Sequence, residues 1–592
     1  MNLHYSLAHE NYKQAHGIFS KTFAMDQLEI NQQTIALISA RRDWAALQLL
    51  LKADEDMTLT VKNRPSFTPH GPLVNVRIEV DLDGFPDSDL SVMPVGYVED
   101  DDRQYRPDVL LEDDTVFVER LKVQPVWIEA AVSADRSPGI YQGTIRIYTH
   151  KMFEDEILAR TMTFTLRVYD VALDDPGDNR FYLNLWLHMS NIARKHEVPL
   201  WSDRHFEILE HYVRSLAQLG QKSVMLFVSE IPWSGQNCFK IVNNLSDLFE
   251  YSMVRISRSA AGEFRYDFSV LEKYIDLCSR YGISREIEVH GLLNIWTCPA
   301  EGYAGPAADY PDAIRLRYLD EADGCGKYMK LGAEIRQYMQ ALEQFFVRKG
   351  IVDIVRITAD EPGDILAYQL RVQALKEIVP RMKIKTIVGH PEFLSRLDCF
   401  AGEEMDLIVH LEAACDDWAA WQKCQNRISG LKGYYVCCGP QRPNTFISSP
   451  LLECRLIGLV AAFMGFDGFL RWNYTVWPDK PRERISYKYP VWQAGDTNFV
   501  YPANNGRPLL SLRYKNLKRG IEDYALIRRL QDLHPDSARI IAQIRDRVFK
   551  IQDIALLSAK SRKKPDELFS MNGEDYAEMK RTVLEALESL SN

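Results

Sequence analysis

Eight short apolar segments, each followed by a helical pattern, constrain the fold of this chain more than any other feature. Strand–helix repetition in this number, over roughly 320 residues, is typical of a (β/α)8 barrel with loop insertions. An open doubly wound sheet is the alternative, but no glycine-rich phosphate-binding turn follows the first strand. We therefore predict a barrel. Its strands are expected at residues 181–188, 223–229, 286–292, 353–358, 384–388, 407–410, 434–437 and 468–472.

The part of the chain before the barrel is rich in strands. Apolar and polar residues alternate at 73–80, 144–148 and 164–168, which is the period of half-buried antiparallel strands. Their regular spacing predicts a β-sandwich. A polar segment with proline and glycine at 173–178 marks a boundary. We therefore predict a β-sandwich domain over residues 1–175.

Helical patterns dominate the last part of the chain. The pattern at 513–533 is expected to complete the barrel, which we place at 176–530. Further helices at 538–557 and 576–590 predict a helical C-terminal extension over 531–592. The predicted fold class is thus an N-terminal β-sandwich, a central (β/α)8 TIM-type barrel and a short helical tail.

Charge and hydropathy limit the partners of the protein. The 592 residues carry a net charge of −11 without a long basic run, so we expect no nucleic-acid partner. No stretch approaches the ~18 apolar residues that span a bilayer, and no signal peptide is recognised at the N-terminus. We therefore expect a cytoplasmic protein without a membrane partner. The sequence predicts no oligomeric state.

The ten cysteines suit neither a disulfide framework nor a zinc site, because no CxxC pair occurs. Cys437 and Cys438 lie in a predicted strand and are interpreted as core residues. His410 and Glu412 form the only close pair of a histidine and a carboxylate, and no third ligand is obvious. We therefore predict neither a metal ion nor a cofactor.

Asp360 and Glu361 are the strongest catalytic candidates, because they follow the fourth predicted strand and barrel active sites lie at strand carboxyl ends. Side chains of a continuing strand point to opposite faces. Pro362 ends the strand and favours an extended backbone at Glu361, so both carboxylates can converge on one ligand. The alternative is a helix start, with one acid near the N-cap and Pro362 at the first helical position. Both interpretations can hold together.

Aromatic and polar residues near other strand ends are candidates for substrate contacts. Aromatic faces suit the C–H-rich faces of sugar rings, although ordinary packing explains single tryptophans equally well. The densest cluster lies at 469–477. The predicted substrate-binding residues are Trp472, Tyr474, Trp477, Asn473, Arg471, Trp296, His290, Asn294, Trp186, His188, Trp233, Glu412 and Asn444.

Several motifs between about residues 100 and 530 resemble glycoside hydrolase family 123 and the associated domain-of-unknown-function family 4091. Together they are specific for that superfamily. The motifs are 198–206 (VPLWSDRHF), 217–222 (AQLGQK), 232–236 (PWSGQ), 360–362 (DEP), 443–446 (PNTF), 468–474 (GFLRWNY), 495–497 (GDT) and 519–524 (RGIEDY).

The resemblance implies a β-sandwich followed by a catalytic barrel, and exo-β-N-acetylgalactosaminidase activity on glycans such as those of glycosphingolipids. It also implies retention of configuration by substrate assistance, in which the 2-acetamido oxygen attacks the anomeric carbon. Glu361 then matches the general acid/base, and Asp360 matches the residue that orients the acetamido group. Without a recognised signal peptide, short oligosaccharides are the expected substrate.

Two alternatives stay open. A conventional retaining glycosidase would use Glu361 as acid/base with Glu412 or Glu230 as nucleophile, which requires carboxyl groups about 5–5.5 Å apart. A non-catalytic glycan-binding protein would keep the barrel without turnover.

Overall fold

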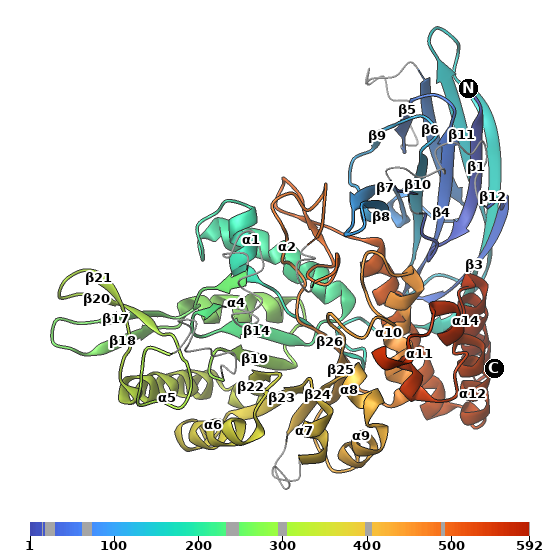
Figure 1. Cartoon of the computed structure of the whole chain (residues 1–592). Helices are drawn as coiled ribbons and strands as arrows, with labels where there is room; N and C mark the ends of the chain where they lie inside the picture. Colours follow the sequence, from blue (N-terminus) through green and yellow to red (C-terminus); the bar gives the residue numbers. More distant parts are fainter. Residues whose placement is uncertain are drawn as a thin grey trace.

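The structure of the protein is a computed structural model that describes residues 1–14, 16–17, 30–61, 74–232, 248–293, 305–396, 405–486 and 492–590. Its main parts are a two-sheet domain, a parallel barrel and C-terminal helices (Figure 1). The predicted fold class is confirmed. The domain limits stay predictions.

Two six-stranded sheets form the N-terminal part, with strand orders β1-β4-β10-β7-β8-β2 and β3-β12-β11-β6-β5-β9. Most neighbours are antiparallel, but β3 runs parallel to β12 and β5 parallel to β6. Alternate apolar side chains of both sheets meet in one core, for example Leu49 and Val126 from the first with Ile78 and Ile145 from the second. The strands are β1 Leu3–His9, β2 His16–Gly17, β3 Thr34–Arg41, β4 Asp43–Ala53, β5 Met57–Thr60, β6 Val74–Leu82, β7 Leu90–Glu99, β8 Gln104–Leu110, β9 Thr115–Val118, β10 Val123–Val132, β11 Gly139–Lys151 and β12 Ile157–Ala172.

All eight predicted barrel strands occur, in the order β13-β26-β25-β24-β23-β22-β19-β14, and neighbouring strands are parallel. The barrel is nearly closed, because β13 and β14 meet through a single bridge between Leu183 and Gln221. The Gln221 side chain extends this contact by accepting a hydrogen bond from the Leu185 N–H at 2.9 Å. The strands are β13 Tyr182–Leu185, β14 Ser223–Phe227, β19 Glu286–His290, β22 Val355–Asp360, β23 Lys383–Val388, β24 Asp406–His410, β25 Lys432–Tyr435 and β26 Gly468–Arg471.

Local signals set the limits of the barrel helices. At the start of α2, the Ser202 side chain accepts a hydrogen bond from the His205 N–H, the usual N-cap contact. The helix ends at Gly220, whose φ of 85° favours glycine and where a Cβ would lie 2.6 Å from the Pro176 carbonyl. The helices are α1 Met189–Lys195, α2 Asp203–Leu219, α4 Ser269–Arg280, α5 Gly332–Lys349, α6 Ile365–Ile378, α7 Pro391–Arg396, α8 Leu411–Asp416, α9 Trp418–Gln425, α10 Leu451–Met464 and α11 Leu512–Leu533.

A small sheet that the sequence patterns did not predict extends from the barrel (Figure 1, left). Its order is β18-β17-β20-β21, and its strands come from the loops that follow β14 and β19. They are only four residues long and largely polar, so they lack a clear alternating pattern. The strands are β17 Arg255–Arg258, β18 Phe264–Asp267, β20 Arg317–Asp320 and β21 Cys325–Tyr328.

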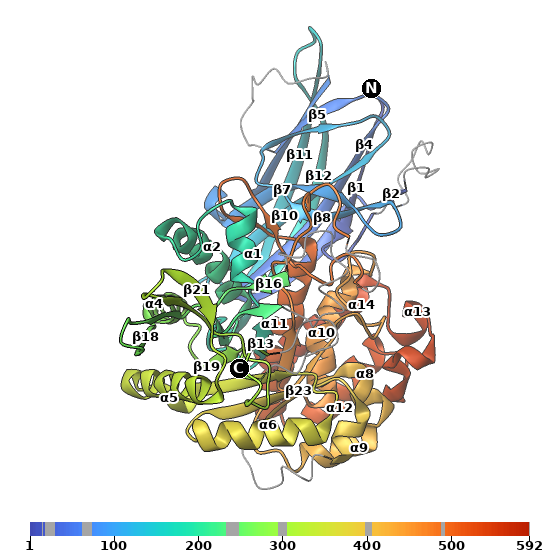
Figure 2. The same ribbon diagram turned by 60° about the vertical axis from the view of Figure 1, so that its left-hand side comes forward.

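The C-terminal helices are α12 Ser537–Val548, α13 Pro565–Leu568 and α14 Gly573–Glu588 (Figure 2). Helix α14 packs against β3 and β12 of the sandwich and against α11, and α12 packs against α11 and α14. The predicted helix at 538–557 is too long, because α12 ends at Val548 and only a 3-10 turn follows at Ile554–Leu557. No helix in the described ranges combines the length and apolar character that a membrane span requires.

Candidate active site

Glu361 leaves its strand in an unusual backbone conformation. Asp360 is the last residue of β22, and Glu361 comes next with a φ of 46°. The left-handed region costs a residue with a side chain about 1–2 kcal/mol. The extended backbone that we predicted from Pro362 is therefore wrong. A hydrogen bond from the Glu361 N–H to the Ile387 carbonyl, at 3.0 Å, holds this turn against the neighbouring strand.

Helix capping in this loop belongs to Asp364. Its side chain accepts hydrogen bonds from the Leu366 N–H at 2.9 Å and the Ala367 N–H at 3.1 Å, and α6 begins at Ile365. The alternative prediction, in which Asp360 or Glu361 caps the helix, is wrong because the helix begins later in the chain. A change at either acid therefore leaves the helix cap intact.

Tyr435 positions the Glu361 carboxylate. The Tyr435 hydroxyl donates a hydrogen bond to Glu361 Oε1, and its ring centroid lies 4.8 Å from that of His410. Burial, with the nearby Glu361 charge, raises the pKa of Tyr435 well above its ordinary value, so the phenol keeps its proton and donates. We missed this residue because we predicted the strand at 434–437, whereas β25 ends at Tyr435.

The first residue after β23 leaves room for the same carboxylate. A Cβ atom at Gly389 would lie 2.9 Å from Glu361 Cδ and 3.0 Å from Oε1. Such distances are shorter than a side chain tolerates, so a glycine lets the carboxylate lie against the backbone. Gly389 directly follows the predicted strand at 384–388, so the expectation that site residues lie just past strand ends could have identified it.

The loop after β25 contacts His410 at the end of β24, beside Tyr435, whose hydroxyl binds Glu361. His410 Nε2 lies 2.8 Å from the Gly439 carbonyl, and a Cβ at Gly439 would lie 3.1 Å from Glu412 Oε2. The Cys437 sulfur lies 3.7 Å from His410 Nε2 and 3.7 Å from the Cys438 sulfur. Cys438 is exposed, so our interpretation of it as a core residue is wrong, because the strand ends before it. Cys437 is half-buried and packs against the core.

A buried ion pair fixes the predicted aromatic contact Trp472. Arg471 Nη2 lies 2.7 Å from Asp496 Oδ1, which also accepts a hydrogen bond from Trp472 Nε1 at 3.1 Å. Burial raises the pKa of Asp496, and the Arg471 charge opposes that shift. Trp472 keeps 8% of its surface exposed, whereas Arg471 and Asn444 have none. Asn444 instead accepts from Arg471 at 2.9 Å and donates to the Cys437 carbonyl at 3.0 Å.

Three predicted contacts gather inside the barrel around a buried carboxylate. Trp186 Nε1 donates to Glu288 Oε2 at 3.2 Å, and the rings of Trp186 and His290 are 4.9 Å apart. His188 Nε2 lies 3.0 Å from the Trp472 carbonyl. Trp186 and His188 have no accessible surface and His290 has 3%. These side chains support the floor beneath the strand ends, and their predicted contacts with sugar have no support in the structure.

The residues after Trp472 turn into the protein interior. Tyr474, with no accessible surface, forms a hydrogen bond with Ser215 of α2 at 2.8 Å, and Trp477 donates to the Val500 carbonyl at 2.7 Å. Asn473 is equally buried and accepts from the Val476 N–H at 3.0 Å. A side chain without accessible surface cannot touch a ligand, so the predicted sugar contacts of these three residues are not supported.

The remaining candidates lie elsewhere. Trp233, Asn294 and Trp296 are outside the described residues. Glu230 forms an ion pair with Arg317, in a pocket between the loops after β14 and β19. Within the described ranges no group of histidine, cysteine and acidic side chains is arranged to hold a metal ion.

The fold and the site define the class of the protein. A parallel eight-stranded barrel with adjacent carboxylates at a strand's carboxyl end is an architecture of glycosidases. The family model "Glycoside hydrolase 123, catalytic domain" matches residues 186–530. The chain therefore belongs to glycoside hydrolase family 123, and it is a glycosidase that acts on a carbohydrate substrate.

One solved structure gives the same fold. A family 123 glycoside hydrolase from Clostridium perfringens, analysed for glycolipid glycan hydrolysis, matches with a TM-score of 0.71 and 17% identity over 100% of both chains. EndoBT-3987 from Bacteroides thetaiotamicron, with a Man5GlcNAc product, covers 84% of this chain and 99% of its own at 9% identity. Its TM-score of 0.22 is too low to indicate a shared fold. No curated protein is significantly similar to this chain.

Proposed function

We propose that the protein removes terminal β-linked N-acetylgalactosamine from oligosaccharides, with retention of configuration and by substrate assistance. The observation that carries the proposal is the adjacent pair Asp360–Glu361 at the end of β22, where Glu361 turns through a left-handed conformation and Asp364 takes over helix capping. Family 123 membership supports the same reaction.

In this mechanism the acetamido oxygen of the substrate attacks the anomeric carbon while the glycosidic C–O bond breaks. Glu361 gives its proton to the leaving oxygen, and Asp360 accepts the acetamido N–H and stabilises the positive charge that develops there. Attack of the acetamido oxygen forms a cyclic intermediate. Water then attacks its anomeric carbon and gives a proton to Glu361, and the ring formed with the acetamido group opens. The hydrogen bond from Tyr435 to Oε1 leaves Oε2 as the proton-carrying atom.

Aryl β-glycosides test the substrate class. We expect hydrolysis of aryl β-N-acetylgalactosaminide and none of the aryl β-galactoside, because only the former carries the attacking group. Equal rates on both would favour a conventional retaining enzyme with Glu412 as nucleophile. No hydrolysis of either, by folded protein, would favour a glycan-binding protein.

Variants of the pair test the two roles. An aryl leaving group needs little protonation, so Glu361→Gln should slow cleavage of a natural oligosaccharide far more than cleavage of an activated aryl glycoside. Asp360→Asn should slow both by similar factors, on the order of 10²-fold or more, because acetamido attack is needed whichever group departs. Circular dichroism should show both variants folded, since Asp364 caps α6. Near-wild-type rates for Asp360→Asn would contradict its assigned role.

A further inference from the structure

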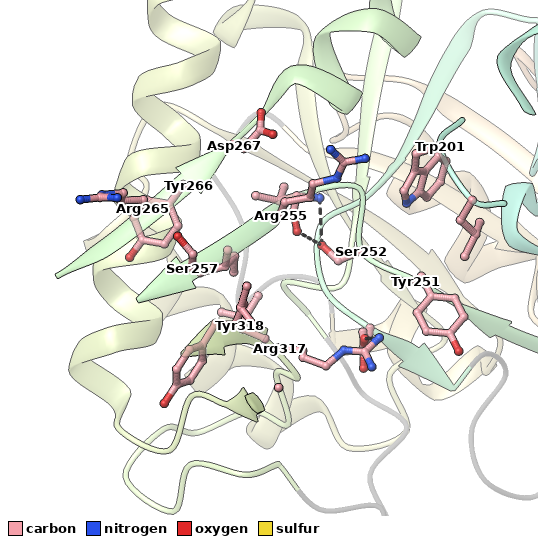
Figure 3. Close-up of a pocket in the computed structure, with 17 residues that line it drawn as sticks. Trp201, Tyr251, Ser252, Arg255, Ser257, Arg265, Tyr266, Asp267, Arg317 and Tyr318 are labelled. Carbon is pink, nitrogen blue, oxygen red and sulfur yellow. Dashed lines mark hydrogen bonds and ion pairs between the residues drawn. The ribbon is translucent and has the colours of Figure 1, made fainter. Parts of the chain in front are cut away.

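A pocket of about 770 Å³ lies beside the small β17–β21 sheet (Figure 3). Its lining residues come from the segment before α2, from the end of β14, and from the small sheet in the loops after β14 and β19. All these segments follow strand carboxyl ends or precede helix amino ends, which is the side where barrel active sites are built. Asp360 and Glu361 come from the next strand along, β22.

One wall of the pocket is aromatic. Trp201 and Tyr251 lie along it, and the guanidinium groups of Arg255 and Arg317 point toward it (Figure 3). Trp201 adopts a φ of 63°, a conformation that bulky residues rarely adopt and that persists only where the surroundings hold it. The Trp201 backbone N–H donates to His205 Nδ1 at 3.1 Å, and the two rings are 5.3 Å apart. The chain therefore holds this indole at the pocket despite a backbone cost.

Three arginines and two carboxylates line the pocket, and the third arginine, Arg265, lies 3.7 Å from Glu321 outside the lining. Arg317 pairs with Glu230, whose second oxygen accepts a hydrogen bond from the Tyr328 hydroxyl at 2.6 Å. Arg255 stands opposite Asp267 in the pairing of β17 with β18. A site for a phosphate or sulfate would instead carry surplus positive charge. Aromatic faces beside guanidinium groups that each have an acidic residue nearby suit a neutral ligand that has hydroxyl groups along its edge.

We infer that this pocket binds a neutral sugar of the glycan beyond the residue that is cleaved. The inference rests on the proposed function for the position of the cleaved sugar. Trp201 and Tyr251 would contact the C–H face of the ring, and Arg255, Arg317 and Glu230 would bind its hydroxyl groups. The pocket then selects substrates by the sugars to which the terminal residue is attached, and it contributes binding energy that an aryl glycoside cannot use.

The kinetic test compares two substrates. Trp201→Ala should lower kcat/KM about tenfold or more for a neutral trisaccharide with a non-reducing β-linked N-acetylgalactosamine on lactose, and leave the aryl glycoside unchanged. Trp201→Phe, which keeps an aromatic face, should recover part of the loss. Trp418→Ala, which removes a half-buried tryptophan of α9 outside the pocket, is the control and should affect neither substrate. Equal losses on both substrates after Trp201→Ala would overturn the inference.

A binding measurement separates this inference from the proposed function. Saturation-transfer NMR on full-length Glu361→Gln protein should detect lactose, and the signal should disappear in the Glu361→Gln/Trp201→Ala double variant. Lactose lacks the cleaved sugar, so its binding stands whether or not N-acetylgalactosaminides are substrates. Absence of lactose binding, or binding confined to sialylated lactose and abolished by Arg255→Ala, would overturn a neutral sugar site.

Discussion

At the scale of single residues, one carboxylate is placed by its own backbone conformation and by two neighbouring residues. Backbone strain turns Glu361, a phenol donates to its Oε1, and a glycine leaves room behind it. Catalytic groups need placement within fractions of an ångström, so each neighbour should matter to the rate more than to the fold. That difference separates a positioning role from a structural one.

Gly389→Ala tests the space behind Glu361. The added methyl group would meet only the end of the Glu361 side chain, at 2.9 Å from Cδ, so the carboxylate should move and the backbone should not. We expect kcat to fall about tenfold or more, on the scale of a misplaced catalytic group, with the melting temperature nearly unchanged. Gly363→Ala is the matched control, since a Cβ there has nothing within 4 Å. Equal activity in the two variants would contradict the prediction.

Tyr435→Phe tests the phenol. It removes the hydrogen bond to Glu361 and keeps the ring against His410, so we expect kcat to fall about 10- to 100-fold, the range for a hydrogen bond to a charged group. Its neighbour offers a control, because the Tyr434 hydroxyl donates to the Ile457 carbonyl at 2.6 Å on the other face of β25. Tyr434→Phe should lower stability and spare kcat. Steady-state kinetics with urea unfolding distinguishes the two outcomes.

The sequence identified the carboxylate pair and missed its partners for a physical reason. Asp360 and Glu361 stand beside a proline at a strand end, which is a local signal. Tyr435 meets Glu361 only because β22 and β25 belong to one curved barrel. Tyr435 is the last residue of β25, whereas the predicted strand ended two residues later, so Tyr435 was not recognised as a strand-end residue. Tyr474 and Trp477 were predicted to face the substrate, but their side chains are buried. Beyond the end of a strand there is no regular spacing from which the direction of a side chain can be predicted.

At the scale of elements, regular strands were predictable and inserted ones were not. The barrel strands are short, mostly buried segments that alternate with helical patterns along the chain, and all eight were found. The β17–β18–β20–β21 sheet has one exposed face and short polar strands, so neither period nor hydrophobicity marks it. The proposed sugar pocket is built on this sheet, so sequence patterns alone did not predict the pocket.

Helix α2 contains a pH-sensitive contact. Burial lowers the pKa of His205 to about 4, although the hydrogen bond between its Nε2 and the Met189 carbonyl opposes this shift. Its Nδ1 accepts a hydrogen bond from the Trp201 backbone N–H. The unfolded chain binds a proton near pH 6.5 and the folded chain does not until about pH 4, so stability falls as the pH falls through this window. The expected loss between pH 7 and pH 5 is about 2 kcal/mol.

Urea unfolding at both pH values checks this expectation. His205→Gln should be less stable than wild type at pH 7, and its free energy of unfolding should change by about 2 kcal/mol less between pH 7 and pH 5. Glu453, whose pKa burial raises to about 7, shifts stability in the opposite direction in both proteins, so the difference between them isolates His205. Parallel pH curves for the two proteins would refute the prediction.

At the scale of the whole molecule, α11 joins the barrel to the sandwich through buried charges. Arg513 lies 3.0 Å from Asp108 of β8, and Arg519 lies 2.8 Å from Asp43 of β4. Lys580 of α14 also reaches Asp43, at 2.7 Å. Although burial opposes it, the charges of Lys580 and Arg519 lower the pKa of Asp43, so the carboxylate stays ionised. A single acid from the sandwich thus connects the helix that completes the barrel and the last described helix.

Removal of Arg519 should loosen this connection. Its guanidinium also contacts Glu10 at 3.1 Å and the Trp44 carbonyl at 2.8 Å, and only 2% of its surface is exposed. Breaking one side of a buried ion pair leaves uncompensated charge and costs about 3–5 kcal/mol. We expect Arg519→Leu to lower the free energy of unfolding by that amount.

The activity of the folded Arg519→Leu fraction at 25 °C should stay near wild type, because none of the Arg519 contacts involves the carboxylate pair. Arg529→Leu is the control from the same helix. This arginine is exposed and donates only to the Ala172 carbonyl, at 2.8 Å, so its loss should cost less than about 1 kcal/mol. The stability of Arg519→Lys should lie between those of the two leucine variants. Lysine keeps the charge but lacks the planar guanidinium that donates to several oxygens at once. Similar unfolding curves for the two leucine variants would show that the buried charges do not connect the parts of the molecule.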